Sequence, residues 1–179
     1  MSALRAVHET VEDDNQPDLT DRAETAPEAL AICALMWSQD PMENSRIASF
    51  LEAEDFDEPA YRELYTIVHT LIVDELPHDP ASVLAELVRA GAGGHRGARI
   101  RRALTDVTTA NACGASASDY AGMVLSESYR RSFYDAGVAI QQLAEQSPEE
   151  YLFEQLVEIG RRQRTATNRL NAFRNGGTV

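Results

Sequence analysis

The chain has 179 residues, and its 16 basic and 29 acidic side chains give a formal net charge of −13. All 16 basic side chains are arginine, since the sequence contains no lysine. This excludes a phosphate-binding loop with its lysine, a Schiff-base mechanism and a lysine general base. The length and the 44% hydrophobic content indicate one soluble globular domain. The acidic surplus disfavours nucleic-acid binding except at a local arginine cluster.

The two cysteines, Cys33 and Cys113, are distant in sequence, and neither belongs to a Cys-x-x-Cys pair. This favours reduced thiols and a cytoplasmic protein, with a single disulfide as the alternative. No signal peptide is recognisable, and no apolar run approaches the roughly 18 residues that a membrane helix needs. We therefore expect no membrane contact.

Residues 1–24 contain seven acidic residues, two arginines and few large apolar side chains. Such a segment cannot bury enough apolar surface to offset its ordering entropy. We expect an acidic, disordered arm before the folded domain.

From Thr25 onward, recurrent helix starts divide the chain. Asp40-Pro41 and Asp79-Pro80 place a capping side chain before proline, as does Asp57-Glu58-Pro59. Residues 25–28 and 147–150 fit the capping box, in which a hydroxyl and a carboxylate satisfy free backbone N–H groups. Together with apolar periodicity these starts predict an all-α fold with seven helices, near residues 27–38, 43–52, 59–75, 80–90, 97–109, 118–146 and 148–173.

The last two of these helices are much longer than the others. A connection near Gln146-Ser147 is too short for anything except an antiparallel hairpin. We expect a compact helical head of about five helices at 25–116, the hairpin at 117–174 and a flexible tail at 175–179. Apolar residues recur every three or four positions along both hairpin helices, as in a coiled-coil seam. Those expected at a dimer or hairpin interface are Leu125, Tyr129, Phe133, Leu152, Leu156, Ile159, Leu170 and Phe173, of which Leu170 and Phe173 favour self-association.

Residues that could carry catalysis do not form a recognisable pattern. The histidines His8, His69, His78 and His95 lack metal-ligand spacing, and no Gly-x-Ser-x-Gly elbow occurs. The glycines at 91–94 follow no strand and fit neither a phosphate loop nor a dinucleotide fingerprint. Carboxylate pairs are abundant simply because the protein is acidic. We expect no catalytic residue, no metal and no cofactor.

Two arginine clusters interrupt the acidic composition. Each can be a solvated helix face or a contact for a partner or for nucleic acid. The first cluster opens its helix, where positive charge does not complement the helix dipole, so a binding role is more reasonable there. The residues of the two clusters with a possible binding role are Arg96, Arg99, Arg101, Arg102, Arg161, Arg162 and Arg164.

A family resemblance covers about two thirds of the chain. Residues 54–65, Glu-Asp-Phe-Asp-Glu-Pro-Ala-Tyr-Arg-Glu-Leu-Tyr, resemble a signature in the N-terminal domain of DnaB-type replicative DNA helicases. The Ala/Leu-rich segment 28–37, the Pro77-His78-Asp79 turn and the segment 128–131 are similar to the family at corresponding places. The resemblance implies an all-helical head with a long hairpin and no catalytic residues. It also implies dimerisation through the hairpin, a collar on the helicase hexamer and docking of primase.

The family's RecA-like motor has no counterpart in the sequence, so we expect a stand-alone, non-enzymatic relative of the collar. It would form a homodimer or higher oligomer and contact a helicase, primase or loader. Two alternatives remain open: a single-stranded nucleic-acid-binding accessory factor that uses the arginine clusters, and a regulator that caps helicase assembly by pairing its hairpin with a full-length subunit.

Overall fold

A computed structural model describes residues 26–91 and 94–177 of the chain. These residues form seven α-helices and two short 3-10 helices, with no strand, which confirms the all-α fold. The helices are α1 (Pro27–Trp37), α2 (Pro41–Phe50), α3 (Pro59–Val73), α4 (Pro80–Arg89), α5 (Gly94–Thr109), α6 (Ala117–Gln146) and α7 (Glu149–Arg174). The 3-10 helices are η2 (Ala53–Asp55) and η3 (Gly114–Ser116).

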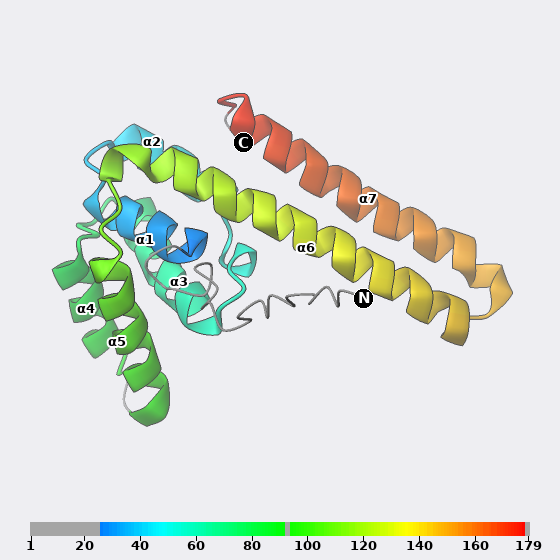
Figure 1. The fold of residues 1–179 in the computed structure, drawn as a ribbon, viewed down its shortest axis with the longest axis horizontal. Helices are drawn as coiled ribbons and strands as arrows, with labels where there is room; N and C mark the ends of the chain where they lie inside the picture. Colours follow the sequence, from blue (N-terminus) through cyan, green and yellow to red (C-terminus); the bar gives the residue numbers. More distant parts are fainter. Residues whose placement is uncertain (1–25, 92–93, 178–179) are drawn as a thin grey trace, which may run out of the picture.

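Helices α1 to α5 form a head, from which the long helix α6 extends (Figure 1). Helix α7 runs antiparallel along α6 and returns its C-terminal end to the head beside α2 (Figure 1). At a rise of 1.5 Å per residue, the 30 residues of α6 span about 45 Å. The far half of the hairpin therefore extends beyond the head.

Helix α1 lies in the middle of the head and is apolar around most of its circumference. Its side chains from Ala31 to Leu35 are completely buried, and it packs against α3, α5 and α6. A helix that is apolar on all sides is stable only when other elements surround it. The core of the head is therefore built around α1, and the start of α6 is part of that core.

Three of the predicted caps, at Asp40, Glu58 and Asp79, are present, and one is wrong. Asp40 accepts hydrogen bonds from the N–H groups of Met42 and Glu43, both at 3.1 Å. Asp79 caps α4 in the same way. Ser147, however, does not cap α7: it is the C-cap residue of α6, where its N–H donates to the Leu143 carbonyl, and Pro148 occupies the N-cap position of α7. Thr25 lies outside the described residues.

The C-terminal end of α7 corrects one expectation about the hairpin. Leu170 and Phe173 are 5% and 6% exposed, so the chain itself covers them. The Phe173 ring meets Phe50 edge-on at 5.5 Å, and the Arg46 guanidinium lies 4.6 Å from the same ring. The head occupies the surface that we expected to self-associate, and Leu125 is buried in the same core.

Candidate interaction surfaces

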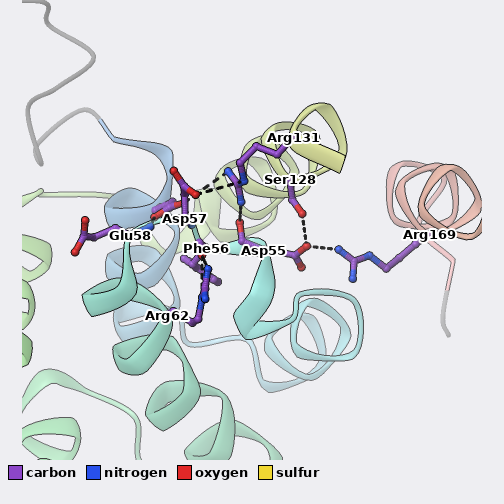
Figure 2. Close-up of polar contacts among 9 residues, drawn as sticks. Asp55, Phe56, Asp57, Glu58, Arg62, Ser128, Arg131 and Arg169 are labelled. Carbon is purple, nitrogen blue, oxygen red and sulfur yellow. Dashed lines mark hydrogen bonds and ion pairs between the residues drawn. The ribbon is translucent and has the colours of Figure 1, made fainter. Parts of the chain in front are cut away.

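The most specific sequence signature forms a polar junction between the head and both hairpin helices (Figure 2). Asp55 is 2% exposed at the end of η2. Its carboxylate accepts hydrogen bonds from Ser128 Oγ of α6 at 2.6 Å and from the Arg169 guanidinium of α7. The other carboxylate oxygen accepts from the Glu52 N–H at 2.8 Å, which closes a capping box around η2. One buried carboxylate therefore closes its own turn and joins it to both α6 and α7.

Arg131 of α6 strengthens the same junction from the other side of the loop. Its guanidinium donates to the Asp55 carbonyl, and it lies 3.8 Å from the Asp57 carboxylate and 4.0 Å from Glu28 of α1. Glu28 is buried, and it accepts hydrogen bonds from the N–H groups of Asp57 and Glu58 at 2.5 and 3.3 Å. Burial raises the pKa of Glu28 above its usual value, although the two N–H donors oppose this effect.

Phe56, at the centre of the signature, anchors the loop in the core. Its ring stacks on Tyr65 at 4.5 Å, and its carbonyl accepts two hydrogen bonds from Arg62. The Tyr65 hydroxyl donates to the Leu51 carbonyl at 2.8 Å, and burial raises the pKa of this tyrosine strongly. We call the set Glu28, Asp55, Ser128, Arg131 and Arg169 the clasp, because it fixes the hairpin to the head.

The hairpin has two unlike sides. On the side of the hairpin that carries the clasp, a polar groove extends toward the outer end and includes Gln142, Gln155 and Glu158. On the opposite side, Phe133 of α6 and Arg174 of α7 line one shallow pocket, so both helices contribute to that side. Residues four positions along the helix, or at helical repeats of 7, 14, 18 or 21 residues, from these two positions lie on the same side. We call this set the apolar face: Phe133, Gly137, Ile140, Phe153, Leu156 and Gly160.

The apolar face is exposed to an unusual degree. Phe133 is 49% exposed and Phe153 is 73% exposed. A Cβ atom added at Gly137 or Gly160 would meet nothing within 4 Å, so no packing inside the chain explains these glycines. A glycine in the middle of a helix costs about 1 kcal/mol relative to alanine. Open glycines beside exposed aromatic rings are typical of a surface on which another helix packs closely.

The other predicted interface residues lie inside the hairpin seam. Tyr129, Leu152 and Ile159 are partly covered between the two helices. The Tyr129 hydroxyl lies 3.2 Å from Thr167 Oγ1, and Gln163 Nε2 donates to the Ser132 carbonyl at 2.8 Å. These polar contacts fix the register of the hairpin. Of the eight predicted residues, Phe133 and Leu156 are the two that remain largely open to a second chain.

The structure places the arginines of each cluster in different surroundings. Arg96 and Arg99 bind Glu63 of α3 at 2.6 and 3.0 Å. Arg99 and Arg102 line a groove of about 850 Å³ together with five carboxylate side chains, which disfavour phosphate; Arg101 is exposed on the same helix. In the second cluster, Arg161 and Arg162 pair with Glu158, and Arg164 is exposed.

Among the described residues, the cysteines and the acidic side chains form neither a disulfide nor a metal site. Cys33 and Cys113 are both free thiols, so the disulfide alternative is wrong, and burial raises the pKa of Cys33. Within residues 26–91 and 94–177, no group of His, Cys, Asp or Glu is arranged to hold a metal ion. None of the helices in the described part of the chain is long and apolar enough to cross a membrane.

A helical head clasped to a long antiparallel hairpin defines a class of all-α modules, and comparison with known proteins gives the family. The family model of the DnaB-like helicase N-terminal domain matches residues 21–126, more than half of the chain. The chain therefore belongs to the DnaB-like helicase N-terminal domain family.

Among solved structures, the N-terminal domain of DnaB helicase from Mycobacterium tuberculosis is similar to this chain. It shares 22% sequence identity, with a TM-score of 0.59, over 78% of this chain and 92% of that chain. At this level of sequence identity, the similarity indicates a common fold and nothing more specific. No curated protein sequence matches the chain.

The clasp is the main feature that sequence reasoning did not assign. Asp55 and Arg169 each lie in a stretch with several side chains of the same charge. The sequence alone therefore does not single them out as partners of each other. The signature itself pointed to residues 54–65, but it did not reveal that Asp55 meets α6 and α7. Periodicity predicted one apolar stripe, but it did not separate the seam residues Tyr129 and Ile159 from Phe133 and Leu156, which lie on the apolar face. The apolar face has no strict repeat of its own because two of its positions are glycine.

Proposed function

We propose that this chain is a non-catalytic oligomerisation and protein-interaction module of DNA replication in the cytoplasm, and that it pairs with a second copy through the apolar face. Its membership of the helicase N-terminal domain family supports the replication context. The observation that carries the pairing is the apolar face itself, with exposed aromatic rings around two open glycines.

A second copy is the occupant that fits this face best. Two hairpins related by a twofold axis would bring identical apolar faces together, and such self-complementary contacts are the commonest form of homodimer. Gly137 and Gly160 would let the helix backbones approach closely while Phe133, Phe153 and Leu156 become buried. Removal of this apolar area from water contributes about 25 cal/mol per Å².

The pairing is tested with two matched double variants. Phe133→Glu with Leu156→Glu puts two charges on the apolar face, and Gln142→Glu with Gln155→Glu puts the same charges on the polar groove. Sedimentation velocity at tens of micromolar should show a dimer for the unaltered chain and the control, and a monomer for the apolar-face variant. Circular dichroism checks that all three remain helical. A monomeric unaltered chain would refute the proposal.

We further propose that this module contacts a replicative helicase, a primase or a loader. Affinity purification from the native host, with mass spectrometry of the co-eluting proteins, should recover at least one of these three. Recovery of metabolic enzymes alone would contradict this role. If the partner is a full-length helicase subunit, and the apolar-face variant no longer captures it, the chain acts by pairing its hairpin with that subunit.

Direct nucleic-acid binding is less well supported, because carboxylates accompany both arginine clusters. Fluorescence anisotropy with labelled single-stranded DNA at low salt provides the test. We expect no saturable binding, and binding that Arg162→Ala with Arg164→Ala removes would instead support the accessory-factor alternative.

A further inference from the structure

The shallow pocket at the root of the hairpin carries positive charge. Its volume is about 550 Å³, and residues of both α6 and α7 line it. Tyr129, Phe133 and Leu170 supply its apolar surface. Arg130 and Arg174 supply its charge. None of the described residues that line it is a carboxylate, whereas five carboxylates line the groove beside α5. The pocket is therefore a basic site in a protein whose net charge is −13.

Both arginines of the pocket have donors available for a ligand. Arg130 is exposed, and its guanidinium makes no hydrogen bond or ion pair with any other residue in the described part of the chain. Arg174 is also exposed, and its guanidinium makes one long hydrogen bond, 3.4 Å, to Ser126 Oγ. Each guanidinium has five N–H donors in a geometry that fits a carboxylate. The donors left over select an anionic ligand.

The lining favours an acidic peptide over a small anion. Ion pairs at exposed positions contribute little individually, and a small anion would leave the Phe133 ring, 49% exposed, in water. A peptide with two carboxylates and an apolar side chain uses both kinds of lining residue. A segment of the same chain is also present at a high local concentration, because it is tethered beside the site.

The part of the chain that precedes the described residues begins next to this pocket. Ala26 lines the groove in which Arg131 of α6 also lies. Successive residues of a helix are about 100° apart, so Arg130 lies little more than a quarter turn around α6 from Arg131. Tyr134 lies between these two positions around the helix and is 75% exposed. The surface of α6 from the groove to the pocket is therefore open to the segment that precedes Ala26.

The sequence before Ala26 contains a segment that matches the pocket in chemistry and in reach. Residues 17–21, Pro-Asp-Leu-Thr-Asp, have two carboxylates, Asp18 and Asp21, on either side of Leu19. An extended chain covers about 3.3–3.6 Å per residue, so Asp21 reaches about 17 Å from Ala26 and Asp18 about 27 Å. Half the circumference of a helix with its side chains is about 17 Å. Both carboxylates can therefore reach the pocket from Ala26.

We propose that residues 17–21 dock in this pocket of the same chain, with the two aspartates on the two arginines and Leu19 on the Phe133 ring. Phe133 also belongs to the apolar face, so the docked segment covers part of the surface assigned to pairing. The segment therefore competes with a second copy for this surface. That competition rests on the proposed function, whereas the docking itself does not.

The test compares NMR shifts of backbone amides in the whole ¹⁵N-labelled chain with those of a synthetic peptide of residues 13–25. Docking predicts that the Leu19 amide shifts differ between the chain and the peptide, because in the chain Leu19 lies beside an aromatic ring. Dilution should leave the shifts of the chain unchanged, since the contact is within one molecule. Equal Leu19 shifts in the chain and the peptide, or release of the segment on dilution, would overturn the intrachain docking.

Two matched double variants locate the contact on the hairpin. Arg130→Gln with Arg174→Gln removes the charge of the pocket, and the Leu19 shifts should return to those of the peptide. Arg161→Gln with Arg164→Gln removes the same charge elsewhere on α7 and should leave the Leu19 shifts as they are. Circular dichroism checks that both variants remain helical. Leu19 shifts that survive the pocket variant, or that are lost equally in both variants, would overturn the site.

The reciprocal variant alters none of the described residues. Asp18→Asn with Asp21→Asn should move the amide shifts of Leu170, while the control Asp13→Asn with Asp14→Asn should leave them unchanged. No movement of Leu170 in the first variant would overturn the docking. A chain that remains monomeric in sedimentation while the Leu19 shifts persist would refute the pairing and support the docking, so the two proposals fail separately.

Discussion

The clasp predicts a strong energetic coupling between Asp55 and Arg169. Asp55→Ala removes an acceptor that serves three donors, one of them a guanidinium. Breaking a buried ion pair costs 3–5 kcal/mol, but Arg169 is 26% exposed and keeps Glu52 at 3.0 Å. We therefore expect Asp55→Ala to lower the free energy of unfolding by about 3 kcal/mol, near the lower end of that range.

Arg169→Ala should cost less, about 2 kcal/mol, because Asp55 retains Ser128 and the Glu52 N–H. The double variant should cost about 1.5 kcal/mol less than the sum of the two single variants, since the shared contact can be lost only once. Urea unfolding followed by circular dichroism measures each value, provided that the slope with urea stays constant.

Arg161→Ala is the matched control on the same helix, because Arg161 is an exposed partner of Glu158. It should change the free energy of unfolding by less than about 0.5 kcal/mol. A coupling energy between Asp55 and Arg169 below about 0.5 kcal/mol would show that the head and α7 are not joined through this pair, and the reasoning about the clasp would fail.

Three further predictions concern single positions. Gly160→Ala should stabilise the isolated helix by about 0.5–1 kcal/mol, since its Cβ meets nothing in the chain; sedimentation should nevertheless show a weaker dimer. Gly114→Ala should lower the free energy of unfolding by about 2 kcal/mol, because its Cβ would lie 2.6 Å from the Trp37 carbonyl oxygen; a urea midpoint equal to that of the unaltered chain would contradict this close approach. Glu28→Gln tests the raised pKa of Glu28. Because the folded state holds this proton more tightly than the unfolded state, acidification from pH 7 to pH 5 stabilises the unaltered chain relative to the Gln variant. Urea midpoints at both pH values measure this difference, and a shift in the opposite direction would refute the assignment.

Local signals explain why much of the fold could be predicted. Asp40 and Asp79 act on N–H groups two and three residues away, so the sequence around them contains the whole interaction. The prediction of a cap at Ser147 was wrong because Ser147 is the C-cap of α6 and the next residue, Pro148, is the N-cap of α7. Proline has no side-chain group that could accept a hydrogen bond there.

Long-range contacts explain what could not be predicted. A regular apolar stripe shows that Phe173 is covered, but it does not show that Phe50 of the same chain covers it. Asp55 likewise meets Arg169 more than a hundred residues along the chain. The sequence does not indicate that the Asn44 amide is buried with an unpaired oxygen. The partner of its nitrogen is His78, which reaches Asn44 only through the path of the chain after α3.

The position of the clasp makes the hairpin a lever with its pivot near the head. From Arg131 to the end of α6, 15 residues extend outward, a free arm of about 22 Å. Any protein that pulls the outer end sideways would turn this arm about Asp55, and Arg131 would carry the strain to Glu28 at the start of α1. A force applied to the tip of the hairpin would therefore act first on the clasp and on helix α1.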